Sequence, residues 1–336
     1  MISSRSRDEL RGMRRLAFLL PLLLSAAPLP TGLPSGPAPD RPVRLAVLGD
    51  FNGPYGSTTY PAPLARSVAR IVNEWRPDAV LSPGDLIGAQ KASLGDAQVR
   101  AMWAAFDREV RAPLSRAGIP FAFTLGNHDA SPRSPRDRRE AAAYWAAHVP
   151  ALAFADRTGF PFRFSFTLGG GAVFVASLDA SGPDVSDTQR EWLSAQLASP
   201  AARAAGARLV VGHLPLAGVS AEKNRPGEVL RDPRPLRQVM EAGGVLAYVH
   251  GHHAAFYPAR LGRLNVLSAG GIGGRDYVGF PGTARSTVTL LTVWPAQGRA
   301  TFETVDAATG QPVDLATLPA RLDGLNGPLV RVTDFR

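Results

Sequence analysis

Residues 121–129 read Phe-Ala-Phe-Thr-Leu-Gly-Asn-His-Asp, and this stretch decides how the rest of the chain is interpreted. Its first five residues form a short apolar run rich in strand-forming side chains. Its last four place an amide, an imidazole and a carboxylate on a glycine turn. One interpretation is a buried strand that ends in reactive side chains, and the other is a polar cap for the following helix.

Four further predicted strands end in a similar way, which favours the first interpretation. Each is followed by a glycine and then by a carboxylate or an imidazole: 43–48 by Asp50, 79–82 by Asp85, 209–211 by His213, and 245–249 by His252. In an open α/β sheet the loops at the carboxyl ends of the strands converge. Together with Asn127, these side chains form a mixed oxygen and nitrogen ligand set that suits divalent first-row metals.

The order Gly-Asp, Gly-Asp, Gly-Asn-His-Asp, Gly-His, Gly-His resembles the calcineurin-like metallophosphoesterase superfamily, over about residues 43–274. The resemblance implies an α/β fold, in the form of a four-layer sandwich of two mixed β-sheets flanked by helices. It also implies an enzyme, a metal-dependent phosphoric ester hydrolase. Such an enzyme cleaves phosphate mono- or diesters of a small substrate by attack of a metal-bound hydroxide.

The resemblance also implies a role for each site residue. The metal ligands would be Asp50, Asn52, Asp85, Asn127, His213 and His252. His128 would face the substrate and assist the leaving group, with Asp129 as its orienting partner. Arg133 and Arg136 follow this motif and could bind substrate, because a guanidinium group matches phosphate oxygens. A solvated approach to the next helix is the alternative interpretation of these arginines.

Two positions depart from the family pattern. Asn52 stands where Asp-x-His is usual, and Ala254 stands where Gly-His-x-His is usual, so both imidazoles of the first metal are missing. His250 or His253 could replace them only if the loop reoriented the side chain. We therefore expect one tightly bound divalent ion (Mn²⁺, Fe²⁺, Zn²⁺ or Mg²⁺) and a weak second site of oxygen donors. The alternative function is a phosphate- or nucleotide-binding protein with a degenerate, mononuclear or inactive metal centre.

The amino-terminal region has the pattern of a signal peptide. Five arginines lie between Arg5 and Arg15, an apolar run covers 16–24, and small residues follow at 25–27. Residues 1–27 are therefore predicted to direct export to the periplasm or out of the cell, and 28–42 form a Pro-rich linker. A cytosolic protein with a basic tail is the alternative. No stable membrane span is expected after signal cleavage.

Composition narrows the remaining function classes. The chain of 336 residues has no cysteine, which excludes disulfides, thiolate ligands and a cysteine nucleophile. Its net charge of +9 comes almost wholly from arginine, because Lys91 and Lys223 are the only lysines. A basic balance is compatible with nucleic acid, but no motif supports that partner. We expect a monomer that acts on a small phosphorylated substrate.

The rest of the chain is assigned to a single phosphoesterase domain. Residues 43–310 form this domain, and a less regular tail at 311–336 is expected to pack on it. An apolar run at 160–167 and another at 172–178 predict a hairpin around three glycines. The segment 301–305 is predicted to complete a second sheet.

Overall fold

The computed structural model describes residues 41–336. The predicted signal peptide and almost all of the Pro-rich linker lie outside the described residues. Within 41–336, no helix is long and apolar enough to cross a membrane.

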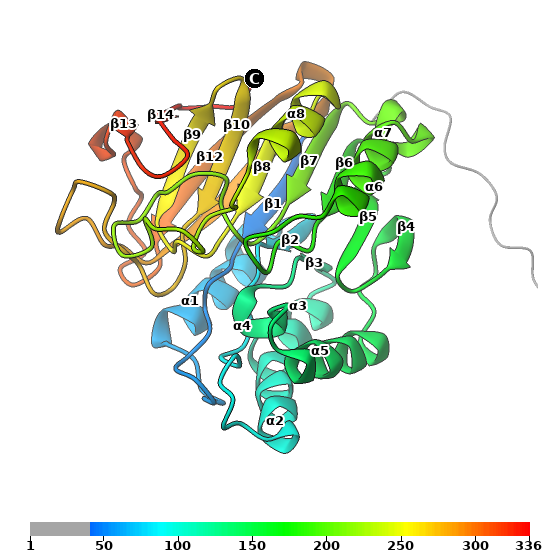
Figure 1. The fold of residues 1–336 in the computed structure, drawn as a ribbon, viewed down its shortest axis with the longest axis vertical. Helices are drawn as coiled ribbons and strands as arrows, with labels where there is room; N and C mark the ends of the chain where they lie inside the picture. Colours follow the sequence, from blue (N-terminus) through cyan, green and yellow to red (C-terminus); the bar gives the residue numbers. More distant parts are fainter. Residues whose placement is uncertain (1–40) are drawn as a thin grey trace, which may run out of the picture. The chain divides into compact units, whose positions relative to one another are not determined.

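The first sheet has five strands in the described part of the chain (Figure 1). In spatial order they are β12 (Arg299–Asp306), β11 (Thr287–Trp294), β1 (Val43–Val47), β2 (Ala79–Ser82) and β3 (Phe121–Phe123). The strands β1, β2 and β3 run parallel, with β3 at the edge, whereas β11 pairs antiparallel with β1 and with β12. The polar loops after β1, β2 and β3 therefore leave the same edge of this sheet.

The second sheet has nine strands within residues 41–336. Their order is β13 (Arg321–Leu322), β14 (Leu329–Arg331), β9 (Phe256–Leu261), β10 (Leu264–Ala269), β8 (Ala247–His250), β7 (Ala207–Val211), β6 (Val173–Ser177), β5 (Arg163–Leu168) and β4 (Ala153–Gly159). Strands β6, β7, β8 and β10 are parallel neighbours, and the outer strands pair antiparallel. Both sheets are mixed, as expected, and the α/β sandwich predicted from the sequence is confirmed.

The assignment of 301–305 to a second sheet is wrong. These residues belong to β12, which pairs with β11 along its whole length in the first sheet. The two strands are joined by only four residues, which include the 3₁₀ turn Pro295–Gln297, so they must be neighbours. The apolar pattern identified a strand here, but such a pattern does not specify the partner that a strand pairs with.

Sequence reasoning also missed strands in the second sheet. β9 contains Pro258, and a proline argues against a strand in a sequence. The tail after residue 311, expected to be less regular, contributes β13 and β14, and β14 pairs with β9. The side chain of Phe335 is fully buried against Phe302, and its backbone exchanges two hydrogen bonds with Ala300.

The helices pack around the sheets. They are α1 (Ala62–Arg70), α2 (Asp96–Phe106), α3 (Ala112–Arg116), α4 (Asn127–Ala130), α5 (Pro135–Ala147), α6 (Asp187–Leu197), α7 (Pro200–Ala204) and α8 (Arg234–Ala242), with π-helical turns at Ile71–Trp75 and Asp107–Arg111. In Figure 1, α6, α7 and α8 lie over the second sheet, while α2 and α5 lie together beside β3. This places helices outside the strands of each sheet.

An aromatic cluster holds β3 against the helices that flank it. The Trp145 indole of α5 stacks on Phe123 of β3 with ring centroids 3.8 Å apart. Trp103 and Phe106 of α2 contact Trp145 edge-on, and all of these side chains are buried. Because β3 leads directly into Asn127 and His128, this packing positions the loop that carries them.

Candidate metal centre

The polar loops turn sharply where they leave their strands. Asp50, Asp85 and His252 have positive φ angles of 48°, 58° and 66°, a backbone region that non-glycine residues rarely adopt. Glycines allow these turns to approach one another: a Cβ on Gly126 would collide with the Asp85 carboxylate, and one on Gly251 with that of Asp50. Strained backbone gathered at one place is typical of a functional site.

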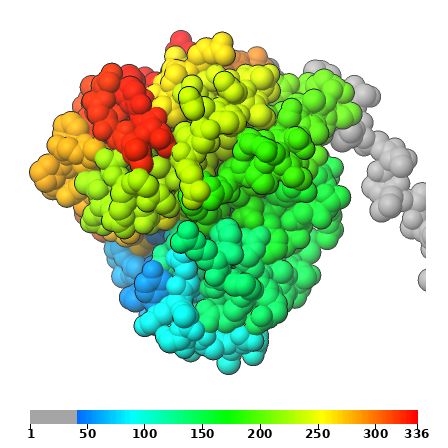
Figure 2. Space-filling view, viewed as in Figure 1, coloured from blue at the N-terminus to red at the C-terminus, as the bar shows by residue number. Residues whose placement is uncertain are grey.

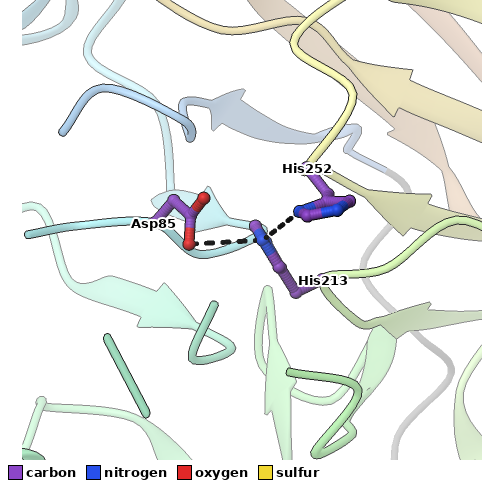
Figure 3. Close-up of side chains that lie close together, drawn as sticks. All are labelled: Asp85, His213 and His252. Atoms are coloured by element: carbon purple, nitrogen blue, oxygen red, sulfur yellow. Dashed lines mark hydrogen bonds and ion pairs between the residues drawn. The ribbon is translucent and has the colours of Figure 1, made fainter. Parts of the chain in front are cut away.

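His213 lies at the centre of the site and is fully buried (Figure 3). Its Nδ1 donates to the Pro83 carbonyl oxygen at 2.7 Å, which fixes the tautomer with a lone pair on Nε2. That Nε2 lies 2.9 Å from Asn127 Oδ1 and 3.2 Å from Asp85 Oδ1. The imidazole thus directs its ligand atom at two oxygens.

His252 completes the group from the opposite side. Its Nε2 donates to Glu228 Oε2 at 2.7 Å, which leaves the Nδ1 lone pair facing His213 Nε2 at 3.2 Å. The pKa of His252 lies well below its usual value, mainly because the ring is buried and also because Lys223 is positively charged. A neutral imidazole is the form that binds a metal.

The geometry of these residues fits one divalent ion. His252 Nδ1, Asn127 Oδ1 and Asp85 Oδ1 gather around His213 Nε2, and ligand atoms of Asp85, His213 and His252 all lie within 4.8 Å of one another. Neighbouring ligands about 2.1 Å from an ion are separated by about 3.0 Å in an octahedron and about 3.4 Å in a tetrahedron, close to the observed 2.9 to 3.2 Å around His213. Two imidazole nitrogens that present lone pairs to each other also require a cation or a proton between them. The sequence predicted all four of these residues.

The pKa values of His213 and Asp85 are both shifted because the two side chains lie close together in the interior. Although burial opposes it, the Asp85 carboxylate raises the pKa of His213 to about 9. Burial alone would raise the pKa of Asp85, but its attraction to His213 and His128 lowers it below the usual range. Without a metal, a proton on His213 therefore takes the position of the cation.

Asp129 holds the two loops of the first sheet together. Its buried carboxylate accepts four backbone N–H groups: Oδ2 from Asp85 and Gly126 at 2.9 and 2.7 Å, and Oδ1 from Leu86 and Ile87 at 2.8 and 2.9 Å. Burial raises the pKa of Asp129 to about 7, and the Gly126 and Ile87 donors oppose that rise. The expected role of orienting His128 is replaced by this one, because the carboxylate points back at the turn that precedes α4.

His128 faces the cavity beside the candidate ligands. Its backbone N–H donates to Asp85 Oδ1 at 3.0 Å, and its Nε2 lies 4.0 Å from Asp85 Oδ2. The ring is packed against Tyr55, with centroids 5.1 Å apart. Burial lowers the pKa of His128.

The other expected ligands lie apart from the group around His213. Asp50 is buried and accepts the His252 backbone N–H on both oxygens, at 2.8 and 3.0 Å. Asn52 lines the cavity with its Nδ2 directed at the Gly53 carbonyl oxygen at 3.3 Å. Within the described residues, Asp85, His213 and His252 are the group of acidic and histidine side chains close enough to share an ion.

Neither spare histidine replaces the missing imidazoles. His253 Nδ1 accepts the backbone N–H groups of Val219 and Ser220, both at 3.0 Å, and its Nε2 donates to the Glu228 carbonyl oxygen. Burial lowers the pKa of His253 to about 3 and that of His250 to about 4, so both are neutral. His250 stacks on Tyr248. His253 thus anchors the loop that connects β7 to α8.

Arg133 and Arg136, the expected substrate-binding arginines, lie in different surroundings. Arg133 lines the cavity. Arg136, within α5, pairs with Asp137 at 2.8 Å and donates to backbone carbonyls of residues 91 and 94. Its guanidinium group therefore stabilises the loop after β2, which is the reason that it does not line the cavity with Arg133.

Three polar residues of this cavity that the sequence did not predict contact the candidate ligands. Gln90 Oε1 accepts from Asn127 Nδ2 at 2.7 Å, which directs Asn127 Oδ1 at the metal position. Glu228 and Lys223 flank His252 and come from the loop between β7 and α8. No motif marks that loop, although Lys223 is one of only two lysines.

Asn127 and His252 line a cavity of about 770 Å³. Its walls come from the loops after β1, β2, β3, β6, β7, β8 and β10, and its charged lining residues are Arg133, Asp184, Lys223, Arg225, Glu228 and Arg275, together with His128 and His252. In Figure 2 the yellow-green residues after β7 lie above the blue segment after β1, with the green residues beside them. The cavity is large enough for a small molecule and lies next to four basic side chains.

Residues 43–256, more than half of the chain, match the sequence model of the calcineurin-like phosphoesterase family. A comparison with curated proteins gives no match. Among solved structures, the chain is similar to purple acid phosphatase PPD1 from yellow lupin (Lupinus luteus) seeds, with a TM-score of 0.59, 15% identity, and coverage of 83% of this chain and 54% of that one. This chain thus spans about half of the lupin protein.

Two further structures are similar. The structure of PhoD gives a TM-score of 0.56 at 11% identity, covering 89% of this chain and 73% of that one. GAP50, described as the anchor in the inner membrane complex of Plasmodium, gives 0.53 at 13% identity, covering 87% and 90%. At these identities the likeness shows the fold.

The Asp129 carboxylate is predicted to support both stability and metal binding. In Asp129→Asn, the side-chain amide group would face two backbone N–H donors, so about 2 to 5 kcal/mol of stability should be lost. Metal affinity should fall at the same time, because Asp85 and Asn127 lose their common anchor. Denaturant unfolding and metal titration measure the two effects. Asp187→Asn, at a side chain 83% exposed, is the matched control. Unchanged metal affinity would contradict this role.

Metal binding is predicted to displace a proton from His213. In the metal-free protein the His213 imidazole carries a second ring proton, on Nε2, below about pH 9, because its pKa is raised to about 9. Apparent metal affinity should therefore rise about tenfold per pH unit between about pH 6 and 8 and level off above about pH 9. Competition with a chelator of known affinity measures the slope. Affinity that is already constant above about pH 7 would show that His213 binds no extra proton.

Proposed function

The chain belongs to the calcineurin-like phosphoesterase family, and on that premise we propose that it is a metal-dependent phosphoesterase that hydrolyses phosphate mono- or diesters. One observation carries the proposal. Ligand atoms of His252, Asn127 and Asp85 gather around His213 Nε2, and Asn127 and His252 line a cavity that also holds His128. Family membership supports the reaction class, and the site supports the chemistry.

We assign the tightly bound divalent ion to these four side chains. A bound ion of this kind lowers the pKa of water and neutralises phosphate oxygens. The protein orients the ligands: Pro83 holds His213, Gln90 holds Asn127, and Glu228 holds His252. This preorganisation means that little rearrangement is needed when substrate enters.

His128 is assigned to the leaving group. Its Nε2 faces the cavity near Asp85, and burial lowers its pKa in the absence of substrate. A phosphate anion beside the ring would favour the protonated form, so the imidazole would gain a proton as substrate binds. That proton can then pass to the departing oxygen.

A second function is favoured by a specific observation. Asn52 and Ala254 stand where the family places imidazoles, and the structural relative GAP50 is described as an anchor. A protein that binds phosphate or a nucleotide through a mononuclear centre, without turnover, would have this site. Fold does not by itself establish catalysis.

Turnover separates the two functions. The purified protein is loaded with Mn²⁺, Zn²⁺, Fe²⁺ or Mg²⁺ and is given an aryl phosphate monoester and an aryl phosphate diester in parallel. Metal-dependent release of the aryl alcohol supports the enzyme. Binding of inorganic phosphate with no release from either ester by any metal form supports the alternative.

His128→Ala is predicted to lower turnover by about 10²- to 10⁴-fold. The metal content should be retained, because His128 contributes none of the four candidate ligand atoms. Metal analysis of the purified variant and steady-state kinetics test both statements. His148→Ala is the matched control, since His148 lies at the end of α5 and stacks on Tyr144. Parallel loss of metal and activity would show that His128 is a ligand.

A further inference from the structure

Lys223 is held in the cavity by a loop that is anchored at several points. His253 binds Val219, Ser220 and the Glu228 carbonyl group of this loop. Asn224 Oδ1 accepts the Leu325 N–H at 2.7 Å, and the Leu230 N–H donates to the Pro215 carbonyl oxygen at 2.9 Å. The lysine side chain is only 14% exposed. Its ammonium group is thus presented at a defined place.

The ammonium group leaves the His252 ligand atom accessible. Lys223 Nζ lies 3.2 Å from both Nδ1 and Nε2 of His252. The lone pair and the N–H of an imidazole point in divergent directions, so equal distances place the cation over the ring face. Nε2 is in any case occupied by Glu228, and Nδ1 remains directed at His213.

The ammonium group also retains hydrogen-bonding capacity. Within the described residues its carboxylate partner is Glu228, at 3.4 Å, and Glu228 is shared with His252 and with Arg225. An ammonium group has three donors, and one divided carboxylate does not saturate them. The remaining donors face a cavity that is also lined by His128 and Asn127.

A second cation, the Arg275 guanidinium group, also contacts His252. Arg275 donates to the His252 carbonyl oxygen at 3.2 Å and to Glu222 Oε2 at 3.0 Å. Asp50, the expected ligand of the first metal, accepts the His252 backbone N–H on both oxygens. Lys223 and Arg275 therefore both contact the residue that is hydrogen-bonded to Asp50. Each carries one positive charge, so together they match the charge of one divalent ion.

No imidazole of the described residues is directed at the expected position of the first metal. Ala254 has no ligand atom, Asn52 is turned to Gly53, and His253 is used by the loop. We propose that Lys223, supported by Arg275, takes the place of the first metal and binds a non-bridging oxygen of the substrate phosphate. The centre then works with one metal ion and one fixed protein cation. This inference rests on the proposed function for the identity of the bound group, a phosphate.

A lysine suits this task chemically. Its ammonium group is a compact point charge that binds phosphate, and it neutralises charge on oxygens without needing ligands of its own. A metal in the same place would require several oxygen or nitrogen donors. The weak second ion expected from the sequence is thus replaced by a charge that the chain itself supplies.

Binding of inorganic phosphate to the full metal-loaded protein tests the proposal without turnover. Calorimetry should give a dissociation constant about 10- to 100-fold higher for Lys223→Met than for the unaltered protein. Metal analysis should give about one tightly bound ion per chain for both proteins. Lys223→Arg keeps the charge and should recover part of the affinity. Lys91→Met removes the other lysine, whose side chain is exposed outside the cavity, and should leave phosphate binding unchanged.

The outcomes distinguish this proposal from the proposed function. Phosphate affinity unchanged in Lys223→Met, or two tightly bound ions in the unaltered protein, would overturn the role of Lys223 whether or not esters are hydrolysed. Lysine-dependent phosphate binding without hydrolysis of any ester would retain Lys223 and reject the enzyme. If thermal melting shows that Lys223→Met is unfolded, the Lys223→Arg and Lys223→Gln pair decides, since only the first keeps the charge. Equal phosphate affinity in that pair would also overturn the proposal.

Discussion

The hydrogen bonds between the Asp129 carboxylate and four backbone N–H groups are the interaction on which the site depends. They join the loop after β2 to the loop after β3, and they do so in the interior, where an unpaired carboxylate would be costly. Asp85 is kept at a positive φ by this arrangement, and Asn127 begins the short helix α4 directly beside it. Two ligands from separate strands are thus brought together by a residue that faces neither the ion position nor the cavity.

The second sheet contributes two candidate ligands, and their orientation is fixed by hydrogen bonds of the imidazole rings. His213 and His252 each use one ring nitrogen for a hydrogen bond that fixes the tautomer, to the Pro83 carbonyl group and to Glu228. The free nitrogens then face each other and the oxygens of Asp85 and Asn127. Pro83 belongs to the first sheet's loop and His213 to the second sheet's loop. The metal position is therefore formed where the two sheets meet, and it depends on their packing.

The loop between β7 and α8 adds polar side chains to the site that no sequence motif marks. It supplies Glu228 and Lys223, and it is fastened by His253, a residue that the sequence pattern offered as a substitute ligand. His253, next to the family motif, thus has a structural role, whereas Lys223, which lies outside every motif, lines the cavity. Relatives with the same fold include a phosphatase and a protein described as an anchor, so the residues of such loops matter more to function than the architecture does.

The sequence by itself determined the features that are local. An apolar run followed by glycine and a polar residue identifies a strand and the loop at its carboxyl end. Five such runs in order predicted that Asp85, Asn127, His213 and His252 would come together and that His128 would lie beside them. These inferences succeed because hydrophobic periodicity and turn chemistry act over a few neighbouring residues.

Only the tertiary structure decided the features that depend on contacts between distant segments. The pairing of β11 with β1, which brings β12 into the first sheet, and the approach of Lys223 and Glu228 to His252 join residues far apart in the chain. The role of Asp129 directs a side chain away from its neighbour. A carboxylate beside a histidine can orient it or can bind backbone N–H groups. The choice is set by which groups the fold buries next to it, because buried donors must find acceptors wherever the chain brings them.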